Sequence, residues 1–358
     1  MLGTDLLARS SPPSAQPIEF CCPLCKGPLR STDDAYRCEP CGKTFPVLLG
    51  IPDFRVFPDP YIDIEADRRK ALVIAERYDQ TDYRGLIRFY WSITPDVPPD
   101  LVDRYVRHAE AGFDRGRHLL ESNETSGAGE GATADRRCLD LGCQTGGMLA
   151  AAAERFGLAV GIDIALRWLV VAKKRMEELG SAAPLVCCCA EFLPFRAEQF
   201  DLVIANNVIE HTSLQEDLLR EAHRVLRPGG DLLGTTVNRF SLALEPHVRV
   251  FGVGWLPARW REPFVQRVRG YPYRNVHLLS CAGLRGLARR TAFSRCRFAL
   301  PSYSAGERRR LSRRDSQLVA LYQALKSWPL ARLLLLLLGP SFVFIAARGP
   351  RAPLSTKS

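Results

Sequence analysis

The chain has 358 residues, too many for one small domain, and its 46% hydrophobic and 25% charged residues are the ordinary composition of a protein with a sizeable core. Its 49 Lys and Arg residues exceed the 39 Asp and Glu residues by ten, which suggests an anionic partner such as RNA, a phosphorylated metabolite or a membrane surface, although free use of arginine by the genome explains it equally well. Three of the twelve cysteines stand in a row at 187–189, which excludes an orderly disulfide framework and favours a reducing cytoplasm.

The N-terminal region carries a candidate metal site. Residues 1–18 hold several prolines and serines and no apolar segment, so we expect a disordered leader and no secretory signal. Residues 19–57 contain two C-x-x-C pairs with twelve residues between them, formed by Cys22, Cys25, Cys38 and Cys41. Four thiolates at this spacing select Zn²⁺ and close its tetrahedral coordination, which predicts a structural zinc ribbon. Cys21 is a spare ligand, and a thiol redox pair is a weaker alternative because it does not explain both pairs.

A helical segment and a linker follow the ribbon. Apolar residues recur at helical spacing over 58–121, and residues 122–135 are small, polar and glycine-rich, as in a flexible linker. Residues 136–350 then alternate short apolar runs with amphipathic segments. Strands are predicted over 138–141, 158–163, 185–189, 201–205 and 231–237, with helices over 147–156, 166–179 and 214–226. This alternation predicts an α/β fold in which a parallel sheet carries helices on both faces.

The C-terminal part is less regular. Residues 238–280 are rich in Arg, Pro and aromatic residues, so we expect an irregular insertion that forms a lid and the substrate wall. Helices over 282–290 and 317–338 and strands over 295–300 and 342–347 complete the prediction. The apolar run after residue 332 is broken by Gly339-Pro340 and is shorter than the roughly 20 residues that span a bilayer. A run of this length still allows a peripheral contact with a membrane surface.

A strand–turn–helix motif lies at Leu139–Gly147, with the sequence LDLGCQTGG. Small residues at such a turn let backbone N–H groups and a helix N-terminus approach a ligand closely. About twenty residues further on, a second apolar strand ends in Asp163, whose carboxylate can accept hydrogen bonds from both hydroxyls of a ribose. The turn reads Gly-x-x-x-Gly-Gly and not Gly-x-Gly-x-x-Gly, which disfavours a nicotinamide enzyme.

In this context the motif resembles that of the class I S-adenosylmethionine-dependent methyltransferases, in particular the small-molecule type seen in ubiquinone and menaquinone biosynthesis. Three further segments match the motifs of that family in order: AEFLPF at 190–195, FDLVIANNVIEH at 200–211 and RVLRPGG at 224–230. The resemblance implies a Rossmann-like methyltransferase sheet and an S-adenosylmethionine cofactor. The segment from Phe45 to Phe54 also resembles the small zinc-binding domain of methyltransferase activator proteins.

The resemblance assigns the cofactor to a set of residues along these motifs, namely Asp140, Gly142, Cys143, Gly146, Asp163, Ile164, Ala190, Glu191 and Asn206. Residues at 140–146 would hold the methionine end, Asp163 the ribose and residues 190–191 the adenine, while Asn206 would line the pocket near the sulfonium. Two positions depart from the family pattern. Gln144 replaces its middle glycine, and Cys189 replaces an aspartate that often accepts from the adenine, although a thiol is a poor acceptor.

The methyl acceptor is less well indicated. His211, just past the fourth strand, is the candidate base, with a packing or helix-capping role as the alternative. The aromatic lid and the apolar C-terminal segment favour a small-molecule, lipid or glycan acceptor. The ribbon and the basic charge favour, as an alternative, a base of rRNA or tRNA. The two departures support a third hypothesis, a catalytically inactive partner that keeps the fold. The sequence indicates no oligomeric state.

Overall fold

The computed structural model describes residues 18–94, 99–123, 125, 133–303, 305–309 and 313–350. Residues 1–17 of the predicted leader, and residues 124 and 126–132 of the predicted linker, lie outside the described residues. The chain divides into two compact units. Unit 1 comprises Met1–Leu120 and Ala128–Gln199, and unit 2 comprises Glu121–Gly127 and Phe200–Ser358.

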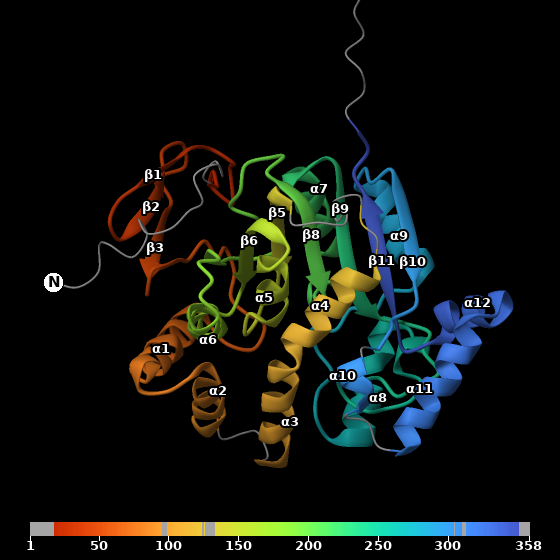
Figure 1. The fold of residues 1–358 in the computed structure, drawn as a ribbon. Coiled ribbons are helices and arrows are strands. Elements are labelled where there is room, and N and C mark those ends of the chain that lie inside the picture. The colour runs from red at the N-terminus through yellow and green to blue at the C-terminus, as the bar shows by residue number, and fades with distance from the viewer. Residues whose placement is uncertain are drawn as a thin grey trace, which may run out of the picture. The chain divides into compact units, whose positions relative to one another are not determined.

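The N-terminal part of unit 1 is a small antiparallel sheet (Figure 1). The four predicted zinc ligands lie at the end of one of its strands or in the turns next to the strands. Its strands are β1 (Leu29–Ser31), β2 (Ala35–Cys38), β3 (Thr44–Leu48) and β4 (Ile51–Pro52). An aromatic cluster of Phe20, Tyr36, Phe45, Phe54 and Phe195 packs beneath it, with ring centroids 5.2–5.7 Å apart. Phe195 lies far along the chain, so this cluster ties the small sheet to the rest of unit 1.

Helices occupy the segment between the ribbon and the main sheet. They are α1 (Ile64–Ala75), the 3₁₀ turn η1 (Tyr78–Gln80), α2 (Tyr83–Ser92), α3 (Pro99–Glu110) and α4 (Gly112–Ser122). Asp63 and Asp82 cap α1 and α2, since their carboxylates accept from the amides of Ala66 and Gly85. Both helices pack against α6 (Leu166–Glu178).

Unit 1 also contains three parallel strands, β5 (Thr133–Leu141), β6 (Phe156–Asp163) and β7 (Leu185–Cys187), in the order β5-β6-β7. Helices α5 (Gly147–Ala153) and α6 pack on them. The strand predicted over 185–189 stops at Cys187, because β6 ends at Asp163, whose carbonyl accepts from the amide of Cys188. Among the described residues, no strand pairs with residues 188 and 189 beyond that point.

Unit 2 contains four strands in the order β10-β11-β9-β8. They are β8 (Phe200–Asn206), β9 (Leu226–Val237), β10 (Arg295–Ala299) and β11 (Ser341–Ala347), covered by α7 (Gln215–Val225) and α9 (Cys281–Arg290). Strands β8 and β9 are parallel as predicted, but β11 runs antiparallel to both of its neighbours. A Cβ atom at Gly234 would meet the buried ring of Phe344 at 2.3 Å, so only glycine lets β9 and β11 approach this closely.

Two predicted segments of unit 2 are more ordered, or ordered differently, than expected. Residues 238–280 are not wholly irregular, since they form η3 (Val253–Trp255) and α8 (Ala258–Arg269) around a small core of Val248, Val250, Val253, Val265 and Tyr273. The helix predicted over 317–338 is two helices, α11 (Arg313–Lys326) and α12 (Pro329–Leu338), preceded by α10 (Ala305–Arg309). Pro329 explains the break, because its ring cannot continue a helix but suits the first turn of a new one.

None of the helices in the described part of the chain combines the length and the hydropathy that crossing a membrane requires.

Candidate functional site

The turn between β5 and α5 has a left-handed backbone at three positions. Gly142 and Gly146 have φ of 65° and 77°, and Gln144 between them has φ of 47°. A non-glycine residue pays about 1–2 kcal/mol in this conformation. Gln144 therefore adopts a backbone conformation typical of glycine, at a cost in stability.

Asp163 at the end of β6 braces this turn. Its two carboxylate oxygens accept from the amides of Gln144 and Ala165 at 2.9 Å and 2.8 Å. Burial raises the pKa of Asp163 to about 6, although both amide hydrogen bonds act in the opposite direction. Each carboxylate oxygen has two lone pairs, so Asp163 can hold the turn and still accept from a ligand hydroxyl.

Asp140 lies beside Asp163 and has an unsatisfied atom. Only 1% of the residue is exposed, and its Oδ2 has no hydrogen-bond partner among the described residues. Burial, and next the charge of Asp163, raise the pKa of Asp140 well above its usual value. A buried carboxylate oxygen without a partner is costly unless a ligand satisfies it. An ammonium group of the methionine end of the expected cofactor fits this environment, because it supplies both hydrogen bonds and positive charge.

The other residues predicted for the cofactor in unit 1 lie around these two carboxylates. Cys143 is buried and donates its amide to the carbonyl of Ile162, and the carbonyl of Ile164 accepts from Arg55. Glu191 is 8% exposed, and Ala190 is partly exposed. The thiol of Cys189 donates to the carbonyl of Phe57 at 3.7 Å, and burial raises its pKa to about 11. Cys189 is therefore a neutral thiol whose hydrogen bond goes to the end of the predicted ribbon.

In unit 2, the end of β8 and the residues that follow it carry a second group of polar side chains. Asn206 accepts from the hydroxyl of Thr235 at 2.5 Å. His211 ends the 3₁₀ turn η2 (Ile209–His211) and is exposed. Its neighbour Glu210 is fully buried, with Oε2 accepting from Thr236 and Oε1 without a hydrogen-bond partner in the described part of the chain.

The structure brings His211 together with two residues of the segment at 238–280 that sequence analysis did not connect with it. Nε2 of His211 lies 3.3 Å from Nε2 of His247, and Nδ1 of His247 lies 2.5 Å from Oε1 of Glu245. The other oxygen of Glu245 accepts from the amides of His247 and Val248 at 2.9 Å and 3.0 Å. The two-residue spacing of Glu245 and His247 is the only signal in the sequence, and it does not point to His211.

The electrostatics of the two histidines differ. Burial lowers the pKa of His247, but the hydrogen bond and the negative charge of Glu245 outweigh it and raise that pKa above its usual value. The pKa of His211 is lowered, first by partial desolvation of the ring and then by the positive charge of His247. A proton that reaches His211 therefore moves preferentially to His247.

The four predicted zinc ligands converge at one end of the small sheet. The sulfur atoms of Cys22, Cys25, Cys38 and Cys41 all lie within 4.8 Å of one another. Cys22 and Cys41 are 3.7 Å apart, and Cys25 and Cys38 are 3.4 Å apart. Thiolates bound to one tetrahedral zinc at about 2.3 Å lie roughly 3.8 Å from each other, so the cluster fits a zinc ion. The thiol of Cys21 instead donates to the carbonyl of Phe195.

A buried ionic network joins the ribbon to the helices of unit 1, and sequence analysis did not predict it. Arg55 donates to Asp53 and Asp67, each at 2.7 Å, and all three side chains have 0% exposure. Arg167 at the start of α6 donates to Asp67 at 2.6 Å and to Asp59 at 2.9 Å. Asp67 also accepts from the amide of Leu166, three residues after Asp163. The network therefore supports the backbone that follows the candidate ribose carboxylate.

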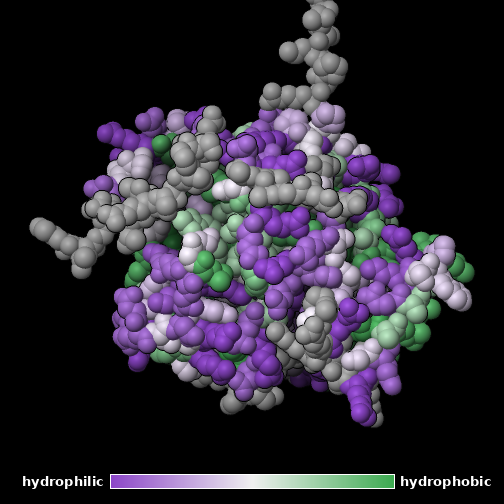
Figure 2. All heavy atoms as spheres, viewed as in Figure 1, coloured by the Kyte–Doolittle hydropathy of each residue, from purple (hydrophilic) through white to green (hydrophobic). Residues whose placement is uncertain are grey.

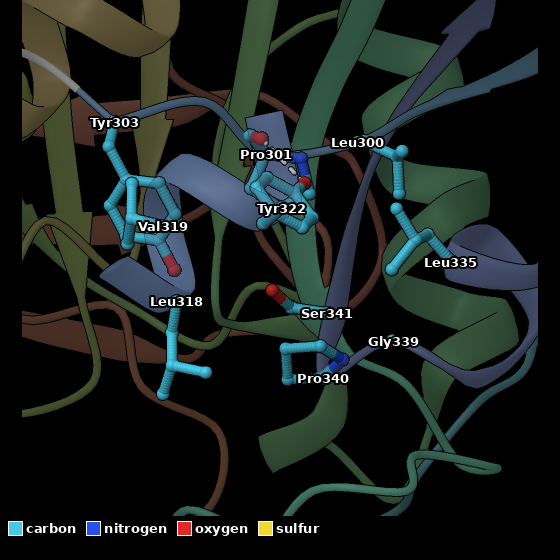
Figure 3. Close-up of a pocket in the computed structure, with 10 residues that line it drawn as sticks. All are labelled: Leu300, Pro301, Tyr303, Leu318, Val319, Tyr322, Leu335, Gly339, Pro340 and Ser341. Atoms are coloured by element: carbon cyan, nitrogen blue, oxygen red, sulfur yellow. Dashed lines mark hydrogen bonds between the residues drawn. The ribbon is translucent and has the colours of Figure 1, made fainter. Parts of the chain in front are cut away.

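A cavity of about 180 Å³ lies elsewhere in unit 2, between α11, α12 and the chain after β10. Figure 3 shows Tyr322 turned toward Pro301, to whose carbonyl it donates at 2.7 Å. None of the predicted cofactor-binding residues lines this cavity, whose walls are mostly apolar.

Comparison with known proteins agrees with the motifs. Residues 139–234 match a family model described as a methyltransferase domain. A ubiquinone biosynthesis O-methyltransferase of Methylobacterium sp. (strain 4-46) is 36% identical over 122 residues, 33% of this chain and 49% of the relative. The protein of the same name from Roseobacter denitrificans is 38% identical over 104 residues, 29% of this chain and 42% of the relative. The matched region thus spans about half the length of these curated relatives.

Among solved structures, a phosphoethanolamine N-methyltransferase 2 of Haemonchus contortus, in complex with S-adenosylmethionine, is 23% identical, with a TM-score of 0.45 over 67% of this chain and 53% of that one. The family match and the motifs confirm the predicted fold class, a mixed α/β methyltransferase sheet that follows a small sheet with a four-cysteine cluster. Residues 139–234 of this chain therefore match a methyltransferase domain, as the motifs predict.

Proposed function

We propose that this chain transfers a methyl group from S-adenosylmethionine to a hydroxyl of a small-molecule, lipid or glycan acceptor. The observation that supports this most is the turn at 140–147, where two neighbouring buried carboxylates flank a left-handed backbone and one carboxylate oxygen has no partner. The curated relatives are named O-methyltransferases of ubiquinone biosynthesis, which favours a hydroxyl over a nitrogen as the methyl acceptor.

The residues of unit 1 have separate tasks in this proposal. Asp140 holds the ammonium of the methionine end through its unpartnered oxygen, and Asp163 accepts from the ribose hydroxyls while it fixes the turn. Bound S-adenosylmethionine supplies a methyl group on a positively charged sulfur. The neutral thioether that leaves needs no protonation. The protein must then orient the acceptor and remove its proton.

We assign the removal of that proton to His211, with His247 as the residue that shares the proton. Glu245 fixes the proton of neutral His247 on Nδ1, which leaves Nε2 unprotonated and facing Nε2 of His211 at 3.3 Å. The two Nε2 atoms can therefore share one proton taken from a hydroxyl. His211 meets the acceptor because it is exposed, and His247 and Glu245 act through it as positioning residues. The predicted lid, residues 238–280, contributes both of these positioning residues.

Replacing Glu245 with glutamine should lower kcat by about tenfold or more and move the rising limb of the pH profile to lower pH. The sign follows from the charge: Glu245 raises the pKa of His247, so a neutral amide lets the histidine pair lose its proton at lower pH. Steady-state rates measured across pH would reveal both effects. Glu262→Gln, at an exposed lid position, is the matched control and should leave the profile in place. A loss of rate without a shift would reduce Glu245 to a purely structural role.

The experiment that tests the proposed function is a transfer assay with labelled S-adenosylmethionine and separated cell fractions. We expect label in the small-molecule or lipid-extractable fraction and none in RNA. Label in RNA alone would support the alternative of an rRNA or tRNA base methyltransferase. Cofactor binding without transfer to any fraction would support a catalytically inactive partner.

We further infer that Cys22, Cys25, Cys38 and Cys41 hold a structural zinc ion. The supporting observation is the convergence of their sulfur atoms within 4.8 Å. The metal would stabilise a segment that contacts the adenine side of the candidate site, because the amide of Cys21 donates to the carbonyl of Pro194, and Lys26 donates to that of Leu193.

Metal analysis should find one zinc ion per chain in protein purified without chelator. Cys38→Ser should lose it and lower the melting temperature, since the fourth thiolate of a closed site is gone. Cys21→Ser is the matched control, because its thiol bonds to the carbonyl of Phe195 and should leave the zinc content unchanged. Absence of zinc in the wild-type chain, or its loss in the Cys21 variant alone, would refute this ligand set.

A further inference from the structure

Helix α12 exposes an apolar face that no described residue covers. Seven of its ten residues are leucines, and none of the ten is buried. Leu330, Leu333, Leu334 and Leu337 are exposed to 71%, 53%, 49% and 49%. Their spacing of three and four residues places them on one face of the helix. A stripe of this kind costs free energy in water, so it indicates a surface with a partner.

The stripe continues onto the segments next to α12. Trp328 immediately before the helix is 68% exposed, and Leu318 and Leu321 on the adjoining helix α11 are 64% and 57% exposed. On the other side, the amide of Leu242 donates to the carbonyl of Leu338 at 2.9 Å, and Leu242 itself is 56% exposed. Figure 2 shows the apolar side chains gathered over α11 and α12. We call the surface formed by α11, α12 and the loop at 240–244 the apolar hairpin.

The positive charge of the chain is concentrated in the same part of the sequence. Residues 238–280 and 305–338 together contain fourteen Arg and Lys residues and four Asp and Glu residues. Their surplus of ten equals the net charge of the whole chain, so the remaining residues are neutral overall. Arg332 is exposed on the side of α12 opposite the stripe. The apolar hairpin therefore belongs to the part of the sequence that carries the positive charge.

We propose that the apolar hairpin docks this protein on the surface of a lipid bilayer that contains anionic lipids. Leucines inserted at the headgroup boundary, a tryptophan at its edge and arginines facing anionic headgroups are the features of interfacial helices. The helix lies in the interface and does not cross it, in keeping with the lack of a spanning helix among the described residues. The proposal stands apart from methyl transfer and would hold for an inactive chain.

Other occupants fit the same surface less well. RNA would match the charge, but it is bound through stacking rings and polar groups and gains nothing from a stripe of leucines. A second copy of this chain would match the leucines, but it would bring a second basic surface into contact with the first. An anionic bilayer satisfies the apolar and the charged requirement together.

Sedimentation with vesicles tests the proposal on the full chain. We expect binding to vesicles of phosphatidylcholine with phosphatidylglycerol, weaker binding as salt rises, and little binding to phosphatidylcholine alone. The double substitution Leu330→Ser with Leu333→Ser should weaken binding by about tenfold or more. Its matched control is Leu72→Ser with Leu179→Ser, which alters two leucines of unit 1 that are 48% and 55% exposed and should change nothing.

Arg332→Glu provides a second variant at an exposed position, where the fold tolerates a change of charge. It should weaken binding to anionic vesicles by about tenfold, because it reverses a positive charge close to the negatively charged membrane surface. Equal vesicle binding by wild type and both hairpin variants would overturn the proposal. So would binding to RNA but not to vesicles, or a dimer in solution that the leucine substitutions dissociate.

Discussion

Replacing Asp163 with alanine is expected to weaken S-adenosylmethionine binding by about a hundredfold or more. The variant loses the carboxylate that accepts from the ribose, and hydrogen bonds to a charged group are worth about 1.5–3 kcal/mol each. It also frees the amides of Gln144 and Ala165, which Asp163 holds at 2.9 Å and 2.8 Å, so the turn that receives the cofactor loosens. Isothermal titration calorimetry measures the change directly.

The fold should survive this substitution. Burial raises the pKa of Asp163 to about 6, which means that the ionised side chain is held at a cost in the folded protein. Its removal takes away a buried charge as well as two hydrogen bonds, so the two effects oppose each other. Asp217→Ala, at an exposed position of α7, is the control for both thermal stability and binding. Unchanged affinity in the Asp163 variant would show that the ribose carboxylate is wrongly assigned.

The second large effect concerns stability. Replacing Asp67 with alanine is expected to lower the free energy of unfolding by about 3–5 kcal/mol. Asp67 has 0% side-chain exposure and accepts from Arg55 at 2.7 Å, from Arg167 at 2.6 Å and from the amide of Leu166 at 2.9 Å. Its loss leaves two buried guanidinium groups short of an anion. Urea denaturation followed by circular dichroism gives the free energy.

Glu65 offers a matched control on the same helix. Its carboxylate pairs with Arg68 at 2.6 Å, but its side chain is 66% exposed, so Glu65→Ala should change the free energy of unfolding by no more than about 0.5 kcal/mol. Equal effects of the two substitutions would contradict the view that the buried network holds the ribbon, α1 and α6 together. A cooperative transition in both variants is required for the comparison.

Local patterns in the sequence predicted most of the main strands and helices. The strand predicted over 158–163 is β6 (Phe156–Asp163), and the helix predicted over 166–179 is α6 (Leu166–Glu178). Both follow from apolar spacing that a few consecutive residues define. The errors have local causes as well. Pro329 divides the predicted C-terminal helix, and the Arg and Pro content of α8 hides its helical spacing.

Contacts between distant residues could not be predicted in this way. The network that joins Asp67 to Arg167 spans a separation of 100 residues, and that between His247 and His211 spans 36. No spacing rule connects such positions, so the sequence named His211 as a candidate base but not its partners. The left-handed φ of 47° at Gln144 could not be predicted either, because the residue type alone does not reveal that the backbone there is glycine-like.

Titration of the wild-type chain with S-adenosylmethionine tests the central claim most directly. We predict one binding site per chain, competed by S-adenosylhomocysteine and lost when Asp140 and Asp163 are both replaced by alanine. A titration that releases no heat in any buffer, with no change in melting temperature at saturating cofactor, would mean that the turn at 140–147 receives another ligand or none.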